Sequence, residues 1–219
     1  MSEREPPRQR LRAGLAALSL DVADATIERL LAYVDLLLRW NATYNLTAVR
    51  DPAEMVTRHL LDSLAVLPHV RGTRLADLGS GAGLPGIPLA LCHRFDAVVL
   101  IDSNGKKARF LREAVRQLGL AAVTVAQGRV ETVRGEFDCI TARAFATLAD
   151  MLAWGGHLLG PDGRWLALKG RIPHDEIAAL PAGFEVESVQ RLDVPGLDAE
   201  RHLVTIRRSA RAADAGNPP

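Results

Sequence analysis

The sequence predicts an α/β fold in which a mostly parallel, seven-stranded sheet follows an N-terminal helical segment. Three observations support this prediction. Up to about residue 70, apolar residues recur at helical spacing. From Leu75 onward, short β-rich runs alternate with helical patterns, which is typical of parallel strands joined by crossover helices. A glycine-rich segment joins the first of these runs to the helix after it.

The chain has 219 residues, which is enough for one α/β domain with an accessory element. We expect the helical segment over residues 1–70 and the α/β domain over residues 71–209. Residues 1–10 and 210–219 contain too few apolar residues to pack, so we expect the first stretch to be disordered and the second to be a flexible tail.

Charge and cysteine content restrict the class of protein. The 27 Lys and Arg residues are balanced by 26 Asp and Glu residues, so any basic surface must be local. Cys92 and Cys139 are the only cysteines, which fits a reducing compartment. No apolar run is long enough to cross a bilayer. We therefore expect a cytoplasmic protein without a membrane partner, and we expect it to be a monomer.

Two helices are expected in the N-terminal segment. Between about Asp24 and Trp40, apolar residues form a broad stripe at helical spacing. The residues that follow interrupt the pattern. Asp51, Pro52 and Glu54 then match an N-cap, a first-turn proline and the acid of a capping box, which predicts a second helix to about residue 66.

The strands are predicted from β-rich runs bounded by turn residues. They cover residues 74–78, 97–101, 122–126, 137–141, 164–168, 184–189 and 202–206. After the second strand, Phe110, Leu111 and Ala114 lie on one face of a predicted helix. The alternation places helices between parallel strands.

Residues 77–86, where the first strand ends and a helix begins, are the most informative segment. Gly79, Gly81 and Gly83 permit a tight turn and let the backbone approach a cofactor where a Cβ would obstruct it. The second strand ends at Asp102, whose carboxylate can accept hydrogen bonds from both hydroxyls of a ribose. Together these features predict a nucleoside-containing cofactor.

Two classes of cofactor fit this loop. Residues 81–86 also spell G-x-G-x-x-G, the pattern of dinucleotide-dependent oxidoreductases. Asp77 favours S-adenosylmethionine instead, because the sulfonium and amino groups of that molecule are cationic, whereas a pyrophosphate would be repelled. Pro85 and Pro88 crowd the first helical turn, which also counts against a dinucleotide. A Rossmann-like, S-adenosylmethionine-dependent methyltransferase fold is favoured.

Structural roles remain open for the same residues. Asp77 is also suited to capping a helix or pairing with an arginine. Asp102 is also suited to capping the helix that follows Ser103 and Asn104. The three glycines have a purely structural alternative.

Several longer segments form a more specific pattern. They are WNATYNLTAV from Trp40, RHLLDSL from Arg58, DLGSGAGLPGIPLA from Asp77, IDSNGKKARFL from Ile101, GRVE from Gly128, TARAF from Thr141, ALKG from Ala167 and ERHLV from Glu200. On these segments the chain, from about Ile27 to Ile206, resembles the bacterial small-subunit rRNA guanine-N7 methyltransferase family known as RsmG or GidB.

This resemblance implies a function and a set of cofactor contacts. The implied reaction is transfer of a methyl group from S-adenosylmethionine to N7 of the guanine at position 527 of 16S rRNA. The implied partner is the 16S rRNA, the small ribosomal subunit or its assembly intermediate. The implied cofactor contacts are Gly79, Leu84, Val130, Glu131 and Arg143.

Residues 141–145 follow the fourth strand, where methyltransferases commonly present groups to the substrate. This segment lacks the Asn/Asp-Pro-Pro-aromatic motif of exocyclic-amine methylation, and Cys139 lies within a strand rather than exposed as a nucleophile. Guanine N7 has an available lone pair, so positioning should dominate catalysis. We expect Arg143 to be catalytic by contacting guanine O6 or the methionine carboxylate, and Phe145 to stack on a base. The alternatives are a plain salt bridge for Arg143 and a core position for Phe145.

Basic residues near the expected carboxyl edge of the sheet are candidates for contacts with RNA phosphates. They are Arg39, Arg58, Lys106, Lys107, Arg109, Arg112, Lys169, Arg171 and Arg201. The alternative for each is a solvated surface charge. No histidine has metal-ligand spacing, so we expect no metal, and we expect His59 and His202 to be hydrogen-bonding residues. A noncatalytic S-adenosylmethionine-binding module is the third hypothesis, and residues 141–145 count against it.

Overall fold

The computed structural model describes residues 6–143 and 146–209. The helices are α1 (Pro7–Ala17), α2 (Asp24–Tyr44), α3 (Pro52–Met55), α4 (Asp62–Leu64), α5 (Gly86–Cys92), α6 (Gly105–Gln117), α7 (Leu148–Gly155) and α8 (His174–Ala178). A π-helical segment, η1, covers Val56–Leu61, and 3-10 turns cover η2 (Leu67–His69), η3 (Val130–Thr132) and η4 (Gly156–Leu158). The strands are β1 (Arg74–Leu78), β2 (Ala97–Asp102), β3 (Val123–Gln127), β4 (Phe137–Arg143), β5 (Leu159–Lys169), β6 (Phe184–Arg191) and β7 (His202–Arg208).

The strands form one mixed sheet in the order β3-β2-β1-β4-β5-β7-β6. β1 to β5 are parallel, and β7 is antiparallel to both β5 and β6. The prediction of a mostly parallel seven-stranded sheet is therefore confirmed. The order reverses between β1 and β4, and in open α/β sheets ligands bind beside the carboxyl ends of the strands at such a switch point.

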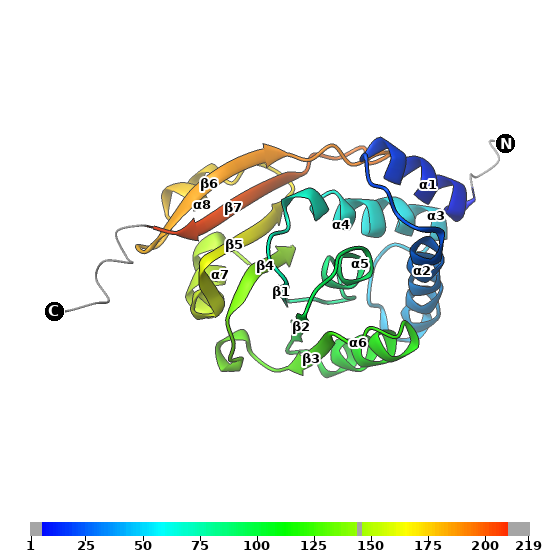
Figure 1. Ribbon diagram of the computed structural model, residues 1–219, viewed down its shortest axis with the longest axis horizontal. Helices are drawn as coiled ribbons and strands as arrows, with labels where there is room; N and C mark the ends of the chain where they lie inside the picture. Colours follow the sequence, from blue (N-terminus) through cyan, green and yellow to red (C-terminus); the bar gives the residue numbers. More distant parts are fainter. Residues whose placement is uncertain (1–5, 144–145, 210–219) are drawn as a thin grey trace.

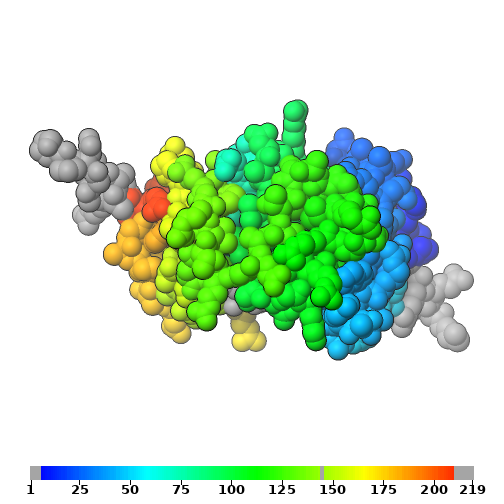
Figure 2. Space-filling view, turned by 90° about the horizontal axis from the view of Figure 1, so that it is seen from below, coloured from blue at the N-terminus to red at the C-terminus, as the bar shows by residue number. Residues whose placement is uncertain are grey.

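Helices cover both faces of the sheet (Figure 1). On one face, α1, α2, α5 and α6 share a core with sheet residues such as Leu75 and Leu100. On the other face, α7 packs on a second core that includes Leu78 and Ile140. Figure 2 shows α6 and β3 in green at the middle of the molecule, between the blue N-terminal helices and the yellow and orange C-terminal strands.

The first helix corrects the prediction for the N-terminus. Because α1 begins at Pro7, residues 7–10 are helical where disorder was expected. Leu11 and Leu15 bury this helix against the core, and an ion pair joins Arg8 to Glu28 of α2. The other residues predicted to be disordered or flexible, 1–5 and 210–219, lie outside the described ranges.

The second helix is longer than predicted. α2 continues to Tyr44, beyond the expected end near Trp40. The side chain of Asn41 accepts a hydrogen bond from Thr47 N at 2.9 Å and donates one to Val49 O at 3.3 Å. These bonds fold the following loop back along the helix, so a residue that interrupts the apolar pattern does not end the helix.

The third helical segment begins as predicted and then changes its geometry. Asp51 caps α3, since its Oδ1 accepts a hydrogen bond from Glu54 N at 3.0 Å, and Pro52 occupies the first turn. The chain then forms η1 before α4 resumes the α-helix. π-Helical turns of this kind frequently occur at functional sites.

Five of the strands are longer than their sequence patterns, and β5 differs most from its pattern. β5 covers residues 159–169 rather than 164–168. Its first half contains Gly160, Pro161 and Gly163, which are poor strand formers, and the pairing with β4 is irregular between Phe137 and Cys139. In the described part of the chain, no helix has both the length and the apolar character needed to cross a membrane.

Candidate functional site

The glycine loop lies between the end of β1 and the start of α5, at the switch point of the sheet. Gly79, Gly81 and Gly83 have φ angles of +64°, +58° and +88°. These values lie in the left-handed region that residues with a Cβ rarely adopt. A Cβ on Gly83 would also lie 2.4 Å from Ile87 Cδ1. The backbone of this loop therefore requires glycine.

Asp77 lies beneath the loop. Its side chain is fully buried, its Oδ2 accepts a hydrogen bond from Gly86 N at 3.2 Å, and its Oδ1 accepts one from Thr141 Oγ1 at 2.8 Å. Burial raises the pKa of Asp77 to about 6, although these hydrogen bonds oppose the shift. Asp77 therefore binds the first backbone amide of α5, whose N-cap residue is Pro85, and it does not line the pocket, where we expected it to meet a cationic ligand.

Asp102 joins the loop to the end of β2. Its Oδ2 accepts a hydrogen bond from Gly81 N at 2.9 Å, and its Oδ1 accepts one from Asn104 N at 2.8 Å. The cap of α6 is Asn104, whose side chain accepts bonds from two backbone amides, so the helix-capping alternative for Asp102 is wrong. Each Asp102 oxygen still has a lone pair for a ligand.

A pocket of about 640 Å³ opens beside Asp102. Its lining residues are Gly79, Ile101, Asp102, Ser103, Asn104, Lys107, Gly128, Arg129, Val130, Glu131 and Trp154. The pocket thus gathers Gly79, Asp102, Val130 and Glu131 from separate segments, as the sequence predicted. Its volume is in the range of about 300–1,000 Å³ that is typical of small-molecule sites. We call it the nucleoside pocket.

The predicted cofactor residues Gly81, Gly83 and Leu84 do not line the nucleoside pocket. Gly81 is in the loop and donates to Asp102, while Gly83 and Leu84 are buried where the loop packs on α5. Trp154, from α7, lines the pocket although it was not predicted. Its position in an apolar helical pattern made it look like an ordinary core residue.

The loop is supported from below by the N-terminal segment. Tyr33 of α2 is fully buried, and its hydroxyl donates a hydrogen bond to Ala82 O at 2.6 Å. Burial raises the pKa of Tyr33 well above its usual value, so the phenol keeps its proton. Sequence analysis placed this residue only in the helix, because nothing in a helical pattern indicates the partner of a buried hydroxyl.

A second pocket, of about 410 Å³, lies at the carboxyl ends of β4 and β5. Its lining residues are Val49, Arg58, His59, Asp62, Arg143, Leu168, Lys169, Gly170 and Arg201. It has no lining residue in common with the nucleoside pocket within the described ranges. We call it the arginine pocket, because Arg143 lies here and not in the nucleoside pocket.

Asp62 is the central anion of the arginine pocket. It is 1% exposed, and its two oxygens contact Arg143 Nη1 at 2.8 Å and Arg201 Nε at 2.7 Å. Arg143 therefore forms the salt bridge that was its structural alternative, while still lining a pocket. Asp62 was not singled out in the sequence, although a carboxylate between Leu61 and Leu64 on an apolar face was a usable signal.

His59 adds a neutral group to the same pocket. Its Nε2 lies 2.9 Å from Thr47 Oγ1, and burial lowers the pKa of His59 to about 4, helped by the charge of Arg143. The other expected hydrogen-bonding histidine, His202, has its Nδ1 at 3.4 Å from Gly170 O. Among the described residues, no group of three or more potential ligands is arranged to hold a metal ion.

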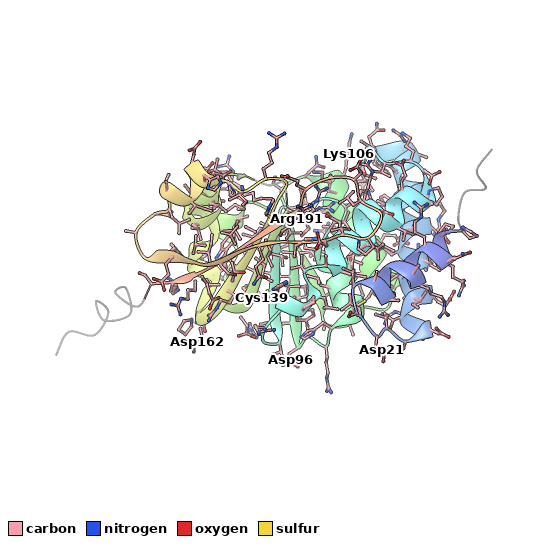
Figure 3. All side chains as sticks on the ribbon, turned by 90° about the horizontal axis from the view of Figure 1, so that it is seen from above. Asp21, Asp96, Lys106, Cys139, Asp162 and Arg191 are labelled. Atoms are coloured by element: carbon pink, nitrogen blue, oxygen red, sulfur yellow. The ribbon has the colours of Figure 1, made fainter. Side chains whose placement is uncertain are left out.

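The predicted RNA-binding residues fall into three groups. Lys106, Arg109 and Arg112 line a third cavity, of about 600 Å³, at the start of α6. Lys106 lies at the same edge of the molecule as Arg191, opposite Asp96 and Asp162 (Figure 3). We call Lys106, Arg109 and Arg112 the α6 basic cluster.

The second group is Arg58, Lys169 and Arg201, which line the arginine pocket. The third group lies elsewhere. Lys107 lines the nucleoside pocket, with Nζ 4.0 Å from Asp102 Oδ2. Arg39 and Arg171 are exposed but line none of these three cavities.

Lys169 has an internal role. Its Nζ donates hydrogen bonds to Glu176 Oε2 at 2.8 Å and to Ala146 O at 3.0 Å, and its side chain is only 15% exposed. Glu176 also accepts a bond from Leu148 N. These contacts connect β5 and α8 to the start of α7.

Phe145 lies outside the described residues, and Cys139 is fully buried as expected.

Comparison with known proteins identifies the family. The model of the GidB family, described as rRNA small subunit methyltransferase G, matches residues 26–204. The chain belongs to this family. The resemblance found in the sequence segments is thereby confirmed, and neither a dinucleotide-dependent oxidoreductase nor a noncatalytic binding module is favoured.

Relatives in the family cover nearly the whole chain. The ribosomal RNA small subunit methyltransferase G of Stenotrophomonas maltophilia is 60% identical over 198 residues, which cover 90% of this chain and 92% of the relative. The protein of the same name from Neisseria meningitidis is 54% identical over 203 residues, which cover 92% of this chain and 98% of the relative. The chain is thus similar in sequence and extent to methyltransferases.

Solved structures support the fold. TrmN from Thermus thermophilus has a TM-score of 0.55 at 20% identity, covering 70% of this chain and 53% of that one. The B. subtilis tRNA methyltransferase TrmK has a TM-score of 0.54 at 20% identity, covering 73% and 70%. At this identity the likeness concerns the Rossmann-like methyltransferase fold alone.

Proposed function

We propose that this methyltransferase transfers a methyl group from S-adenosylmethionine to N7 of the guanine at position 527 of 16S rRNA. The observation that supports this proposal is the pair of pockets on either side of the β1/β4 switch point. The nucleoside pocket lies over β1, β2 and β3, and the arginine pocket lies at the ends of β4 and β5. A methyl donor and a nucleotide acceptor would meet between them.

The residues of the nucleoside pocket fit the proposed donor. Asp102 can accept hydrogen bonds from both ribose hydroxyls. Val130 offers an apolar surface and Trp154 an aromatic ring for a flat base. A pyrophosphate fits less well, because the Gly81 amide already donates to Asp102 and the carboxylates of Asp102 and Glu131 would repel its charge.

Catalysis by this site is proposed to depend on positioning. S-adenosylmethionine would supply the methyl group from its sulfonium centre. The N7 lone pair of guanine, which needs no prior deprotonation, forms the new bond to the methyl carbon as the bond from sulfur to that carbon breaks, and S-adenosylhomocysteine leaves. The chain therefore needs no general base, and its task is to hold the acceptor in line. Arg143 is the proposed catalytic residue, since its guanidinium can donate to guanine O6.

The substrate is proposed to bind along the carboxyl edge of the sheet, as 16S rRNA or as the small ribosomal subunit or its assembly intermediate. The α6 basic cluster and Arg58 expose positive charge there, which suits RNA phosphates. Lys169 and Lys107 are not proposed as phosphate contacts. Lys169 forms internal hydrogen bonds, and Lys107 lies at the nucleoside pocket.

The decisive experiment locates the transferred methyl group. Small ribosomal subunits from cells that lack this protein would be incubated with the purified chain and isotopically labelled S-adenosylmethionine, and the rRNA digested and mapped by mass spectrometry. We expect 7-methylguanine at position 527. A label at another nucleotide, at another atom of that guanine or on a ribosomal protein would refute the proposal.

A further inference from the structure

Asp62 connects three distant parts of the chain at the arginine pocket. It is the first residue of α4, directly after η1, while Arg143 ends β4 and Arg201 immediately precedes β7. Figure 1 shows the connection between β6 and β7 reaching across to the helices of the N-terminal segment. Arg201, at the end of this connection, contacts Asp62. The side chain of Asp62 is 2% exposed and contacts both guanidinium groups at less than 3 Å.

A buried carboxylate between two arginines is a costly arrangement. Removing charges from water costs several kcal/mol for each ion, so replacement by apolar residues is often neutral or stabilising. The sequence around Asp62 is apolar, with Leu60, Leu61 and Leu64 all buried. A charge retained at this place, on the wall of a pocket, is better explained by what it does to the arginines than by stability.

Asp62 determines which hydrogens of Arg143 remain for a ligand. Arg143 Nη1 donates to Asp62 Oδ2 at 2.8 Å and to Arg58 O at 3.2 Å. An Nη nitrogen carries two hydrogens, so both hydrogens of Nη1 are engaged. The guanidinium is therefore held in one orientation, and the Nε and Nη2 hydrogens remain for contacts in the pocket.

This restriction suits a reaction at guanine N7. An arginine without other partners commonly recognises guanine by donating hydrogen bonds to O6 and N7 together, which is the commonest specific arginine–base contact. Such a bidentate contact would occupy the lone pair that must attack the methyl group. Because both Nη1 hydrogens of Arg143 are engaged, the end-on contact through Nη1 and Nη2 is excluded, and Nη2 alone can donate to O6 and leave N7 unoccupied.

We propose that Asp62 is a positioning residue for methyl transfer, which holds Arg143 so that it binds the acceptor guanine through O6 without occupying N7. Arg201 Nε donates a hydrogen bond to the other oxygen of Asp62 at 2.7 Å and so helps to fix the orientation of that carboxylate. This inference depends on the proposed function, because it assigns a role in the acceptor subsite of the same reaction.

The test is a double-mutant cycle between Asp62 and Arg143. Single-turnover methylation of unmethylated small subunits would be measured at saturating S-adenosylmethionine for the wild type, Asp62→Asn, Arg143→Lys and the double variant. Misplacement of a reacting group by about 1 Å can reduce a rate on the order of 100-fold. We expect a loss of this size for Asp62→Asn at saturating S-adenosylmethionine, where a change in cofactor affinity does not contribute to the rate. In the Arg143→Lys background, Asp62→Asn should cost little more, because it acts through Arg143.

A remote ion pair provides the matched control. Arg164 and Glu187 lie 2.6 Å apart on β5 and β6, with side chains 26% and 35% exposed. Glu187→Gln breaks this ion pair, which lines neither the nucleoside pocket nor the arginine pocket. The variant should therefore leave the single-turnover rate unchanged. A merely structural role for Asp62 would give additive losses in the cycle, and such additivity would overturn the proposal, as would a normal rate for Asp62→Asn.

A measurement on the wild type keeps the inference testable if Asp62→Asn does not fold. Side-chain ¹⁵N NMR would report the guanidinium of Arg143, assigned by its absence in Arg143→Lys. We expect separate Nη signals, because engaged Nη1 hydrogens hinder rotation of the group. One averaged signal would show that Arg143 is not held. If the wild type methylates no nucleotide, the proposed function fails, and this NMR result still decides whether Asp62 fixes Arg143.

Discussion

The hydroxyl of Tyr33, in the middle of α2, donates a hydrogen bond of 2.6 Å to the backbone carbonyl of Ala82 in the glycine loop. Both residues are buried, so water cannot replace this bond. The N-terminal segment therefore supports the loop that borders the nucleoside pocket. This contact explains why helices that precede the α/β domain matter for a site made at the ends of its strands.

Tyr33→Phe should destabilise the protein and weaken its binding of S-adenosylmethionine. The variant leaves the buried carbonyl of Ala82 without a partner, which costs about 1–3 kcal/mol. Urea unfolding would measure the loss of stability, and calorimetry would measure the affinity. Tyr44→Phe, at the end of the same helix, is the control and should change neither quantity. Normal stability of Tyr33→Phe would show that the loop does not depend on this bond.

Asp102→Ala should weaken cofactor binding more than it weakens the fold. The variant removes the proposed ribose acceptor and also the partner of Gly81 N. We expect a loss of about 1.5–3 kcal/mol in the affinity for S-adenosylmethionine, the scale of a hydrogen bond to a charged group. Asp96→Ala, an exposed carboxylate at the opposite edge, should leave the affinity unchanged (Figure 3). An unchanged affinity in Asp102→Ala would remove this residue from the site.

Trp154 should report the binding of S-adenosylmethionine by fluorescence. It lines the nucleoside pocket, whereas Trp165 is fully buried in the second core. The emission change on titration should disappear in Trp154→Phe and persist in Trp40→Phe. Trp154→Ala should also weaken binding by about 0.5–1.5 kcal/mol, the value of an aromatic pair. A signal that survives in Trp154→Phe would place the cofactor elsewhere.

His59 should make stability depend on pH in mildly acidic solution. Burial lowers the pKa of His59 from 6.5 to about 4. Between these values the unfolded chain binds a proton at His59 that the folded chain does not, so the contribution of His59 to the free energy of unfolding falls as the pH falls, by at most about 3 kcal/mol. His59→Gln should flatten this part of the profile, measured by urea unfolding from about pH 7 to about pH 4. His157→Gln, at an exposed histidine, should not. Parallel profiles for the wild type and His59→Gln would contradict this prediction.

The α6 basic cluster should contribute counterion release to RNA binding. Replacing Lys106, Arg109 and Arg112 by Ala should weaken binding to the small subunit and reduce the slope of log K against log salt by about 0.7–0.9 for each phosphate that the variant no longer neutralises. The affinity for S-adenosylmethionine should not change. Arg94→Ala, at an exposed arginine outside this cluster, is the control. A slope that the triple variant leaves unchanged would show that these charges are only solvated.

The sequence by itself determined the order of the seven strands along the chain, the helices α2 and α6, the glycine loop and the acid at the end of β2, whereas α1 was missed. These features are local, because β-rich runs, left-handed glycines and strand ends are properties of neighbouring residues. The pocket brings Gly79 and Asp102, which these local features indicated, together with Val130 and Glu131, which the family resemblance implied. The long helical pattern of α2 and the cap at Asp51 were also visible, because helix periodicity and capping depend on residues within a few positions.

Only the tertiary structure decided which polar groups meet across the chain. Asp77 looked like a ligand-facing acid until the packing of β4 gave it Thr141 as a partner, 64 positions away. Lys169 looked like a phosphate contact until α8 supplied Glu176. Asp62 meets Arg143 and Arg201 at separations of 81 and 139 residues. A buried charge takes the partner that the fold brings to it, and a linear pattern contains no information on that partner.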